Sequence, residues 1–198
     1  MQKTTLELCK NIPGCEIGYC QSDEITLVLV DFKNRDSEAW FDGNLQKITS
    51  ISSSIATAYF NQIRMKRANS FDIKLAQFDS RVWSLSDPWE VYNAFLWRQQ
   101  DATKNSIQMV AQSLASHKEC QNKHGGKLQE LIFQKGQNWN DYPTVAKRGT
   151  FFYKVSETVG ETIRSSWKTD LESPILTTDP NWFFEKLSLI EQPKKKEN

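Results

Sequence analysis

The sequence predicts a protein of the α+β class, in which a small antiparallel sheet is combined with several long helices. A run of β-branched and apolar residues follows a polar turn at residues 21–24, as is typical of a β-hairpin. Apolar residues recur at three- and four-residue spacing from residue 45 to residue 58, as is typical of an amphipathic helix. With 198 residues, of which 38% are hydrophobic, the chain is long enough to bury the core of one domain.

The first expected elements are a short helix and the hairpin. Residues 5–11 have the pattern of the end of a helix. The helix should stop at residues 13–14, because proline lacks a backbone N–H and glycine accepts a left-handed turn. The hairpin follows and places the pair Asp23-Glu24 at its turn. A long helix is then expected to begin near Glu38.

The middle of the chain is expected to hold a basic loop, a short strand and a second long helix. The loop carries Arg64, Lys66, Arg67 and Lys74. It could contact RNA phosphates, which contribute affinity without sequence information, and a solvated loop fits the sequence equally well. Residues 78–85 predict the strand. The helix has a proline in its first turn, at residue 88, and is expected to reach residue 114.

The last part of the chain is expected to hold shorter elements. A pair of glycines interrupts the helical pattern, which resumes at residues 127–135, and residues 150–155 predict another strand. After that strand the periodic pattern weakens. We therefore divide the chain into residues 1–155 and an extension of residues 156–198, whose charged tail from about residue 193 is expected to be disordered.

Composition excludes several classes of protein. The net charge of +1 gives no strong field for a nucleic acid or a membrane, so a polyanion would have to bind a local basic patch. The sequence shows no apolar run of membrane-spanning length and no leader, and we expect a cytoplasmic protein without a membrane partner. The four cysteines have neither zinc-knuckle spacing nor the density of a secreted disulfide scaffold, which predicts reduced thiols.

Asp23 is the candidate functional residue that the pattern itself suggests. Mg²⁺ is commonly held by one or two carboxylates together with the phosphates of a nucleotide, and the turn of a hairpin can present a carboxylate in this way. One acid cannot hold two ions, and no partner acid is found upstream. An aspartate that only stabilises the turn is the alternative interpretation.

Other residues have both a functional and a structural interpretation. Four tryptophans lie close to polar clusters and could border a base-binding surface: Trp40, Trp89, Trp97 and Trp139. Trp97 itself is expected in the core, and Arg98 is expected to pair with Asp101 along the helix. The run His117, Cys120, His124 could face one side of a helix as zinc ligands do, but only three ligands are visible and metal binding is not the favoured interpretation.

Four separated groups of motifs resemble those of a known family in their residues and in their order along the chain. They are Gln21-Ser22-Asp23-Glu24-Ile25; Phe78-Asp79-Ser80-Arg81-Val82; Trp97-Arg98-Gln99-Gln100-Asp101 with Asn105-Ser106-Ile107-Gln108; and Phe133-Gln134-Lys135-Gly136 with Asn138-Trp139-Asn140 and Lys147-Arg148-Gly149-Thr150. Over about residues 1–155 the chain resembles the tRNA-His guanylyltransferase family, most of all its bacterial guanylyltransferase-like branch.

The resemblance implies a fold and an activity. The fold would be similar to a polymerase palm, an antiparallel sheet with helices packed on one face, with a mainly helical C-terminal part. It would be incomplete at its N-terminus, because the family's first strand, which carries an Asp-Gly and a Phe-His, is absent from this sequence. Family members add nucleotides to a tRNA 5′ end in the 3′-to-5′ direction, using GTP or ATP and a two-ion Mg²⁺ site. The resemblance also implies a homo-oligomer, either a dimer or a tetramer.

The resemblance also assigns roles to residues. Asp23 matches a catalytic metal carboxylate, and Ser22 matches a residue beside the nucleotide phosphates. Lys47 matches a lysine that contacts a triphosphate, although Asn44 stands where the family has an arginine. Lys104 and Asn105 are the candidate RNA-binding residues. They lie where the eukaryotic enzymes have His-Ile-Asn-Asn, which favours repair of 5′-truncated tRNA over strict guanylate addition to tRNA-His.

The absent first acid leaves an alternative function open. Such a chain could be a catalytically inactive relative that still serves as a tRNA-binding or oligomer subunit. In that case we expect tRNA binding with little template-dependent addition of GTP. A helical interaction module outside the family is a third, less favoured interpretation.

Overall fold

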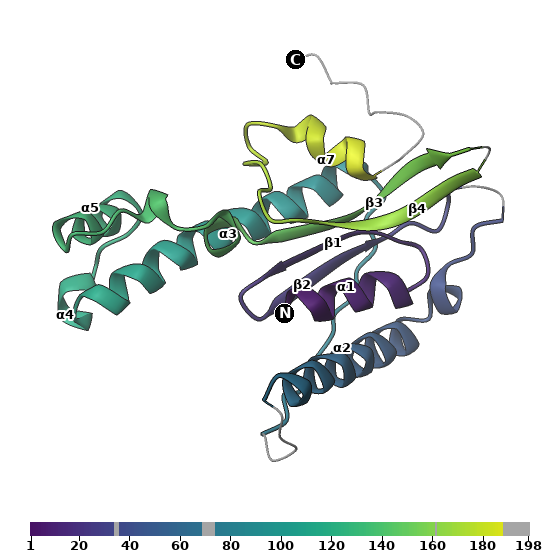
Figure 1. The fold of residues 1–198 in the computed structure, drawn as a ribbon, viewed down its shortest axis with the longest axis horizontal. Coiled ribbons are helices and arrows are strands. Elements are labelled where there is room, and N and C mark those ends of the chain that lie inside the picture. The colour runs from purple at the N-terminus through teal and green to yellow at the C-terminus, as the bar shows by residue number, and fades with distance from the viewer. Residues whose placement is uncertain (34–35, 69–73, 161, 188–198) are drawn as a thin grey trace.

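The fold is an antiparallel sheet with helices on both faces and a helical arm at one end (Figure 1). The computed structural model describes residues 1–33, 36–68, 74–160 and 162–187. Four strands form the sheet in the order β2-β1-β3-β4. They are β1 (Cys15–Gln21), β2 (Glu24–Leu29), β3 (Thr150–Val159) and β4 (Thr162–Asp170). The predicted α+β class is confirmed.

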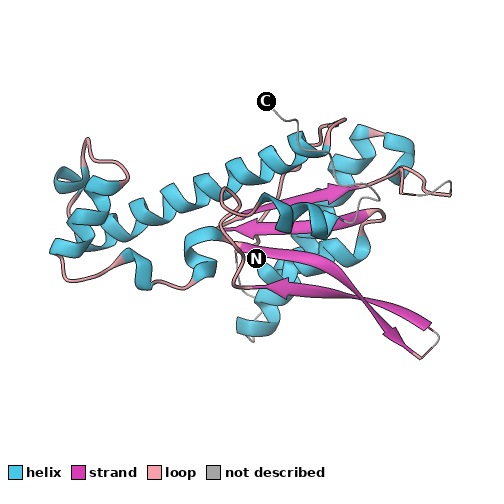
Figure 2. Ribbon diagram, turned by 90° about the horizontal axis from the view of Figure 1, so that it is seen from above, coloured by secondary structure: helices cyan, strands magenta, loops and turns pink. Residues whose placement is uncertain are grey.

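The helices divide between the two faces of the sheet and the arm (Figures 1 and 2). Their bounds are α1 (Gln2–Asn11), η1 (Trp40–Gly43), α2 (Leu45–Ala68), α3 (Pro88–Leu114), α4 (His117–Cys120), α5 (Gly126–Gln134), η2 (Trp139–Asp141), α6 (Thr144–Arg148) and α7 (Pro180–Leu187). The helices α1 and α2 cover one face, and the first half of α3 together with α7 covers the other. The expectation of helices on a single face is therefore wrong.

Alternation along β1 explains why both faces are covered. Ile17 and Tyr19 point into a cluster with α3 and α7, whereas Cys20 points into a cluster with α1 and α2, which Cys15 joins because the register of β1 shifts between Cys15 and Ile17. Successive side chains of a strand leave on opposite faces, and β1 is buried from Cys15 to Cys20, so it needs cover on both. Gly18 contributes to this packing, because a Cβ there would lie 2.4 Å from the Cys9 sulfur.

The predicted hairpin is confirmed. β1 and β2 pair in antiparallel register up to Gln21 and Glu24, which leaves Ser22 and Asp23 as a two-residue turn. Ser22 has a φ of +47°, the left-handed conformation that tight hairpin turns require. Such a turn fixes the register, and therefore holds Ser22 and Asp23 at one defined end of the sheet.

The boundaries of α2 differ from the prediction at both ends. The helix begins at Leu45 rather than near Glu38, because η1 precedes it and the Asn44 side chain accepts a hydrogen bond from the Lys47 N–H at 3.1 Å. At the other end it continues to Ala68. Arg64, Lys66 and Arg67 therefore lie on its last turns, and the predicted loop is wrong for these three basic residues.

The predicted strand at residues 78–85 is also wrong, since this segment has no regular secondary structure. Its polar and aromatic contacts are with α2 instead of another strand. The Phe78 N–H donates to the Thr57 hydroxyl at 3.1 Å, and the Phe78 ring packs edge-on against Phe60 at 5.3 Å between centroids. Tertiary contacts with a helix have replaced the ladder that the residue pattern suggested.

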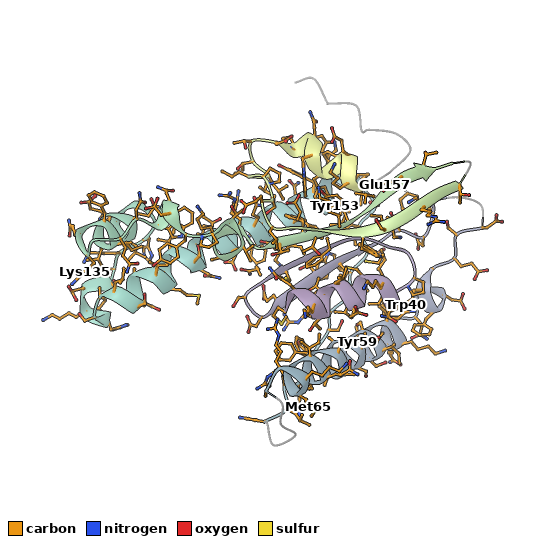
Figure 3. The ribbon with its side chains drawn as sticks, viewed as in Figure 1. Trp40, Tyr59, Met65, Lys135, Tyr153 and Glu157 are labelled. Atoms are coloured by element: carbon orange, nitrogen blue, oxygen red, sulfur yellow. The ribbon has the colours of Figure 1, made fainter. Side chains whose placement is uncertain are left out.

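The residues after 155 contribute to the main core. β3 runs beyond its predicted end and pairs with β4 along its length. Tyr153 faces α7 (Figure 3), and Phe183, Phe184 and Leu187 of α7 are buried in the same cluster. The division at residue 155 thus falls inside β3, and it remains a prediction. The predicted disordered tail from about residue 193 lies outside the described residues.

Candidate functional site at the β1–β2 turn

The β1–β2 turn is held against the middle of α3. Arg98 donates from Nη1 to Oε2 of Glu24 at 3.0 Å, and Gln21 donates to the same oxygen at 3.2 Å. The predicted Arg98–Asp101 pair is not formed, because Arg98 reaches across to the turn and Asp101 accepts a hydrogen bond from Asn105 at 3.0 Å. One charged contact therefore ties an end of the sheet to α3.

Asp23 is the free acid of this turn. Its side chain is exposed and has no hydrogen bond or ion pair with any residue that the structure describes. Its neighbour Glu24 is already paired with Arg98. An unpaired carboxylate beside a neutralised one can accept a hard cation without first losing another partner.

Two further segments contact the sheet at the end of β1, next to the turn. The buried Tyr19 hydroxyl donates to the carbonyl of Arg148 at 2.7 Å, and the pKa of Tyr19 is raised chiefly by burial, so that the phenol stays neutral. Gln2 of α1 donates to the hydroxyl of Thr150 at 3.0 Å. The N-terminus of α1 and the junction between α6 and β3 therefore meet the end of β1 next to the turn.

The site residues predicted from sequence are only partly brought together. Ser22 and Asp23 are adjacent in the turn, whereas the start of α2 lies at the opposite end of the sheet (Figures 1 and 2). Lys47, in the first turn of α2, is exposed, with its Nζ 5.8 Å from the centre of the Phe41 ring. A nucleotide-binding role for Lys47 remains a prediction, and the structure does not place it beside Asp23.

The middle of α3 carries the predicted RNA-binding residues. Lys104 and Asn105 are exposed, and Asn105 is tied to Asp101 as described above. Trp97 is not in the core, and that prediction is wrong, because 59% of this residue is exposed. The Arg98 guanidinium lies 5.0 Å from the centre of the Trp97 ring. Sequence reasoning missed the Trp97–Arg98 pair at the turn because its contact with Glu24 joins residues that are distant in sequence.

The other three candidate tryptophans have structural roles. Trp89 packs against Phe184 at 4.5 Å, and Trp40 stacks on Phe41 at 4.8 Å. Trp139 donates to the Ser106 hydroxyl at 3.1 Å and fixes η2 on α3. All three are at least partly buried, so Trp97 is the exposed tryptophan of the four.

The described residues contain no group of three His, Cys, Asp or Glu side chains that could hold a metal ion. The helix α4 ends at Cys120, so His117 and His124 do not share a helical face as the sequence spacing suggested. The four cysteines are free thiols, as predicted, and the pKa of Cys9 is raised, first by a hydrogen bond with Cys15 and then by burial. No helix in the described part of the chain is long and apolar enough to span a membrane.

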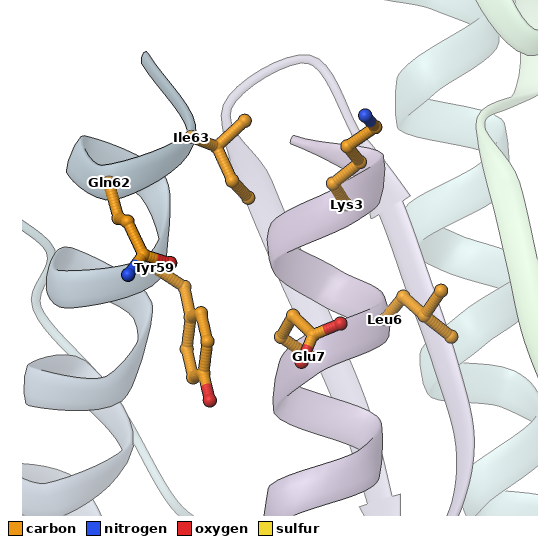
Figure 4. A pocket seen from close by; sticks show the side chains of 6 residues that line it. All are labelled: Lys3, Leu6, Glu7, Tyr59, Gln62 and Ile63. Atoms are coloured by element: carbon orange, nitrogen blue, oxygen red, sulfur yellow. The ribbon is translucent and has the colours of Figure 1, made fainter. Parts of the chain in front are cut away.

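An open groove of about 400 Å³ lies between α1 and α2 (Figure 4). Its lining is mostly apolar and consists of Lys3, Leu6, Glu7, Tyr59, Gln62 and Ile63. None of the site residues predicted from sequence contributes to it. The turn, not the groove, is therefore the candidate site.

Several solved structures are similar to this chain in fold and sequence. A bacterial tRNA(His) guanylyltransferase-like protein in complex with ATP matches with a TM-score of 0.82 and 39% identity, over 94% of this chain and 77% of that one. A complex of such a protein with GTP matches with a TM-score of 0.78 and 38% identity, over 95% and 76%. The tRNA(His) guanylyltransferase of Saccharomyces cerevisiae, at a TM-score of 0.60 and 19% identity over 75% and 73%, shares the fold.

Sequence comparisons agree. A family model described as tRNAHis guanylyltransferase matches residues 1–86. A probable tRNA(His) guanylyltransferase of Dictyostelium discoideum is 26% identical over 176 residues, which is 82% of this chain and 67% of that protein. An uncharacterized protein of Acanthamoeba polyphaga mimivirus is 27% identical over 177 residues, which is 78% and 60%. The chain therefore spans only about two thirds, or less, of the length of these two relatives.

Proposed function

Because this chain belongs to the tRNA-His guanylyltransferase family, we propose that it adds nucleotides to the 5′ end of a tRNA in the 3′-to-5′ direction. The substrates would be nucleoside triphosphates and either tRNA-His or a 5′-truncated tRNA. The observation that carries the proposal is the free carboxylate of Asp23 in a fixed turn, in a fold shared with a guanylyltransferase-like protein in complex with ATP.

The residues of the turn would act by positioning and charge. Asp23 would hold one Mg²⁺ through its carboxylate, and Ser22 would lie beside the phosphates. When bound, Mg²⁺ would neutralise the negative charge of the triphosphate. Arg98, through Glu24, keeps the turn in place, which matters because transfer reactions at phosphates gain most of their rate from alignment and electrostatic stabilisation.

The fit to Mg²⁺ is limited to one ion. A single carboxylate plus substrate phosphates is a common way to bind Mg²⁺, and Asp23 meets that requirement. The part of the chain that the structure describes has no group of three ligands for a two-ion site. This observation favours a second candidate function, a tRNA-binding or oligomer subunit that does not catalyse transfer.

A nucleotide-addition assay separates the two functions. The purified chain is incubated with Mg²⁺, labelled GTP and either 5′-truncated tRNA or tRNA-His, and tRNA binding is measured in parallel. Addition that is lost in Asp23→Asn supports the enzyme. Tight tRNA binding without addition supports the second function, and a chain that neither binds nor extends tRNA contradicts both.

Asp31→Asn is the matched control for this assay. Asp31 is also an exposed aspartate, but it follows the other end of β2, so its substitution changes the net charge equally without touching the turn. The homo-oligomer and the cytoplasmic location are further proposals that rest on the family. Sedimentation velocity of the purified chain tests the first of them.

A further inference from the structure

We infer that Trp97 is a stacking platform for the base of the nucleoside triphosphate whose phosphates lie at the β1–β2 turn. This inference rests on the proposed function and adds a base-binding residue to it. The starting observation is that 59% of Trp97 is exposed although its side chain is large and apolar. Single exposed apolar residues are common, so exposure alone does not indicate a binding site. Trp97 differs in its place beside the turn and in the restricted mobility of its ring.

Two short contacts place Trp97 near the β1–β2 turn. The centre of the Trp97 ring lies 5.0 Å from the Arg98 guanidinium, and that guanidinium donates to Glu24 at 3.0 Å. Glu24 is the residue after Asp23. A ligand with its phosphates at the turn therefore has the indole of Trp97 within reach of its base.

The same arginine also restricts the mobility of the Trp97 ring. Arg98 is held at one end by Glu24, and it lies against the ring of Trp97, which limits the motion of the indole. Trp97 has no hydrogen bond and no other ring contact with any residue in the described ranges, so much of the ring is open to a ligand. Restricting an aromatic ring before the ligand arrives lowers the entropy that binding must overcome.

The chemistry of such a platform defines its ligand. Stacking on an aromatic ring accepts every base, because each base has a π-face, and it does not read hydrogen-bonding edges. A purine offers more overlap with an indole than a pyrimidine does. The expected ligands are thus purine nucleoside triphosphates, with no strong discrimination between ATP and GTP at this residue.

Titration calorimetry with three probes tests the inference. GTP and ATP carry both base and phosphates, whereas inorganic tripolyphosphate carries only the phosphates. In the presence of Mg²⁺, Trp97→Ala should weaken GTP and ATP by about 5-fold to 150-fold, the range expected for loss of one stacked base. The same variant should bind tripolyphosphate within about twofold of the wild type, because stacking involves the base alone.

Two further variants control for structure. Trp97→Phe keeps a ring and should retain most of the affinity. If GTP stacks on Trp97 it should quench the tryptophan fluorescence of the wild type, and this part of the quenching should be lost in Trp97→Phe. Trp83→Ala removes a tryptophan that is similarly exposed, at 51%, but lies in the irregular segment before α3, and it should bind GTP as the wild type does.

The outcomes are distinguishable. Equal GTP affinity in the wild type and in Trp97→Ala, with tripolyphosphate bound by both, overturns the platform and leaves the proposed function standing. Equal losses for GTP and tripolyphosphate also overturn it, since the effect would then not involve a base. If the wild type binds none of the three probes, the proposed nucleotide site itself is wrong, and so is the stacking platform.

Discussion

Asp23 and Glu24 are neighbours of similar chemistry with different surroundings. Glu24 pairs with Arg98, whereas Asp23 has no partner among the described residues. The side chains of Arg98 and Glu24 are 26% and 48% exposed, so their pair contributes at most about 1 kcal/mol to stability. Its main consequence is geometric, because it fixes where the free carboxylate lies.

Gly149, at the junction of α6 and β3, allows the chain to pass close to the end of β1 next to the turn. Its φ is +76° and its ψ is −166°, a conformation that is nearly restricted to glycine. A Cβ there would lie 2.7 Å from the Cys20 carbonyl and from the Tyr19 ring. We predict that Gly149→Ala lowers the free energy of unfolding by about 2–5 kcal/mol, measured by urea denaturation.

Gly136→Ala separates the two causes of this loss. Gly136 also has a positive φ, of +82°, but a Cβ there would have no atom of the described residues within 4 Å. It should therefore lose only the conformational part, about 1–2 kcal/mol. Equal losses in the two variants would show that the close approach to β1 does not matter.

The sequence predicted the turn residues but not their partners. A polar pair between a short β-run and an apolar run is a local signal, and it located Ser22 and Asp23 correctly in the hairpin turn. The Arg98–Glu24 contact joins residues 74 positions apart, and no local pattern encodes it. Trp97 was misplaced for the same reason: its burial depends on what packs against α3 at that point.

At the scale of elements, the predictions succeeded where a local signal is strong. Proline at the first turn of α3, with the Asp87 side chain accepting from the Trp89 N–H at 2.8 Å, made the start of that helix predictable, and its predicted end at Leu114 is also confirmed. The predictions of elements failed where contacts between residues distant in sequence determine the structure. The segment that contains Phe78 packs on α2, and β4 depends on pairing with β3.

The helix α7 is the element whose contribution the sequence least revealed. Its Phe183 is fully buried and packs against Tyr92 and Phe95 of α3, with ring centroids 5.9 Å and 5.2 Å away. We predict that Phe183→Ala destabilises the whole domain by about 3–5 kcal/mol in urea denaturation, because it leaves a cavity between α3 and the sheet.

The control for this variant is Phe133→Ala in α5. Phe133 is 66% exposed, so its removal should change the free energy of unfolding by no more than about 0.5 kcal/mol. A small effect of Phe183→Ala would mean that α7 is not part of the cooperative core and would support an independent extension after residue 155.

At the scale of the whole molecule, the candidate site and the stability of the fold involve different residues. The turn lies at one end of the sheet with Asp23 exposed. Two hydrophobic clusters lie between the sheet and the helices on its faces, and a third lies between α3 and α5 in the arm. The helical arm of α4 and α5 extends away from the sheet beyond the turn (Figure 1). Substitutions in the turn should therefore change ligand binding without changing the fold.

Ligand-induced stabilisation tests this separation across the whole molecule. A ligand that binds only the folded state raises the free energy of unfolding by about 1.4 kcal/mol at ten times its Kd. For a domain of this size the corresponding rise in Tm is roughly 3–6 °C. We predict this rise for the wild type and for Asp31→Asn with GTP and Mg²⁺, measured by differential scanning calorimetry. Asp23→Asn should have the unliganded Tm of the wild type but almost no rise, because its amide is a far weaker Mg²⁺ ligand. A full rise in Asp23→Asn would mean that the nucleotide binds elsewhere, and a lowered Tm without ligand would mean that the turn is part of the folded core.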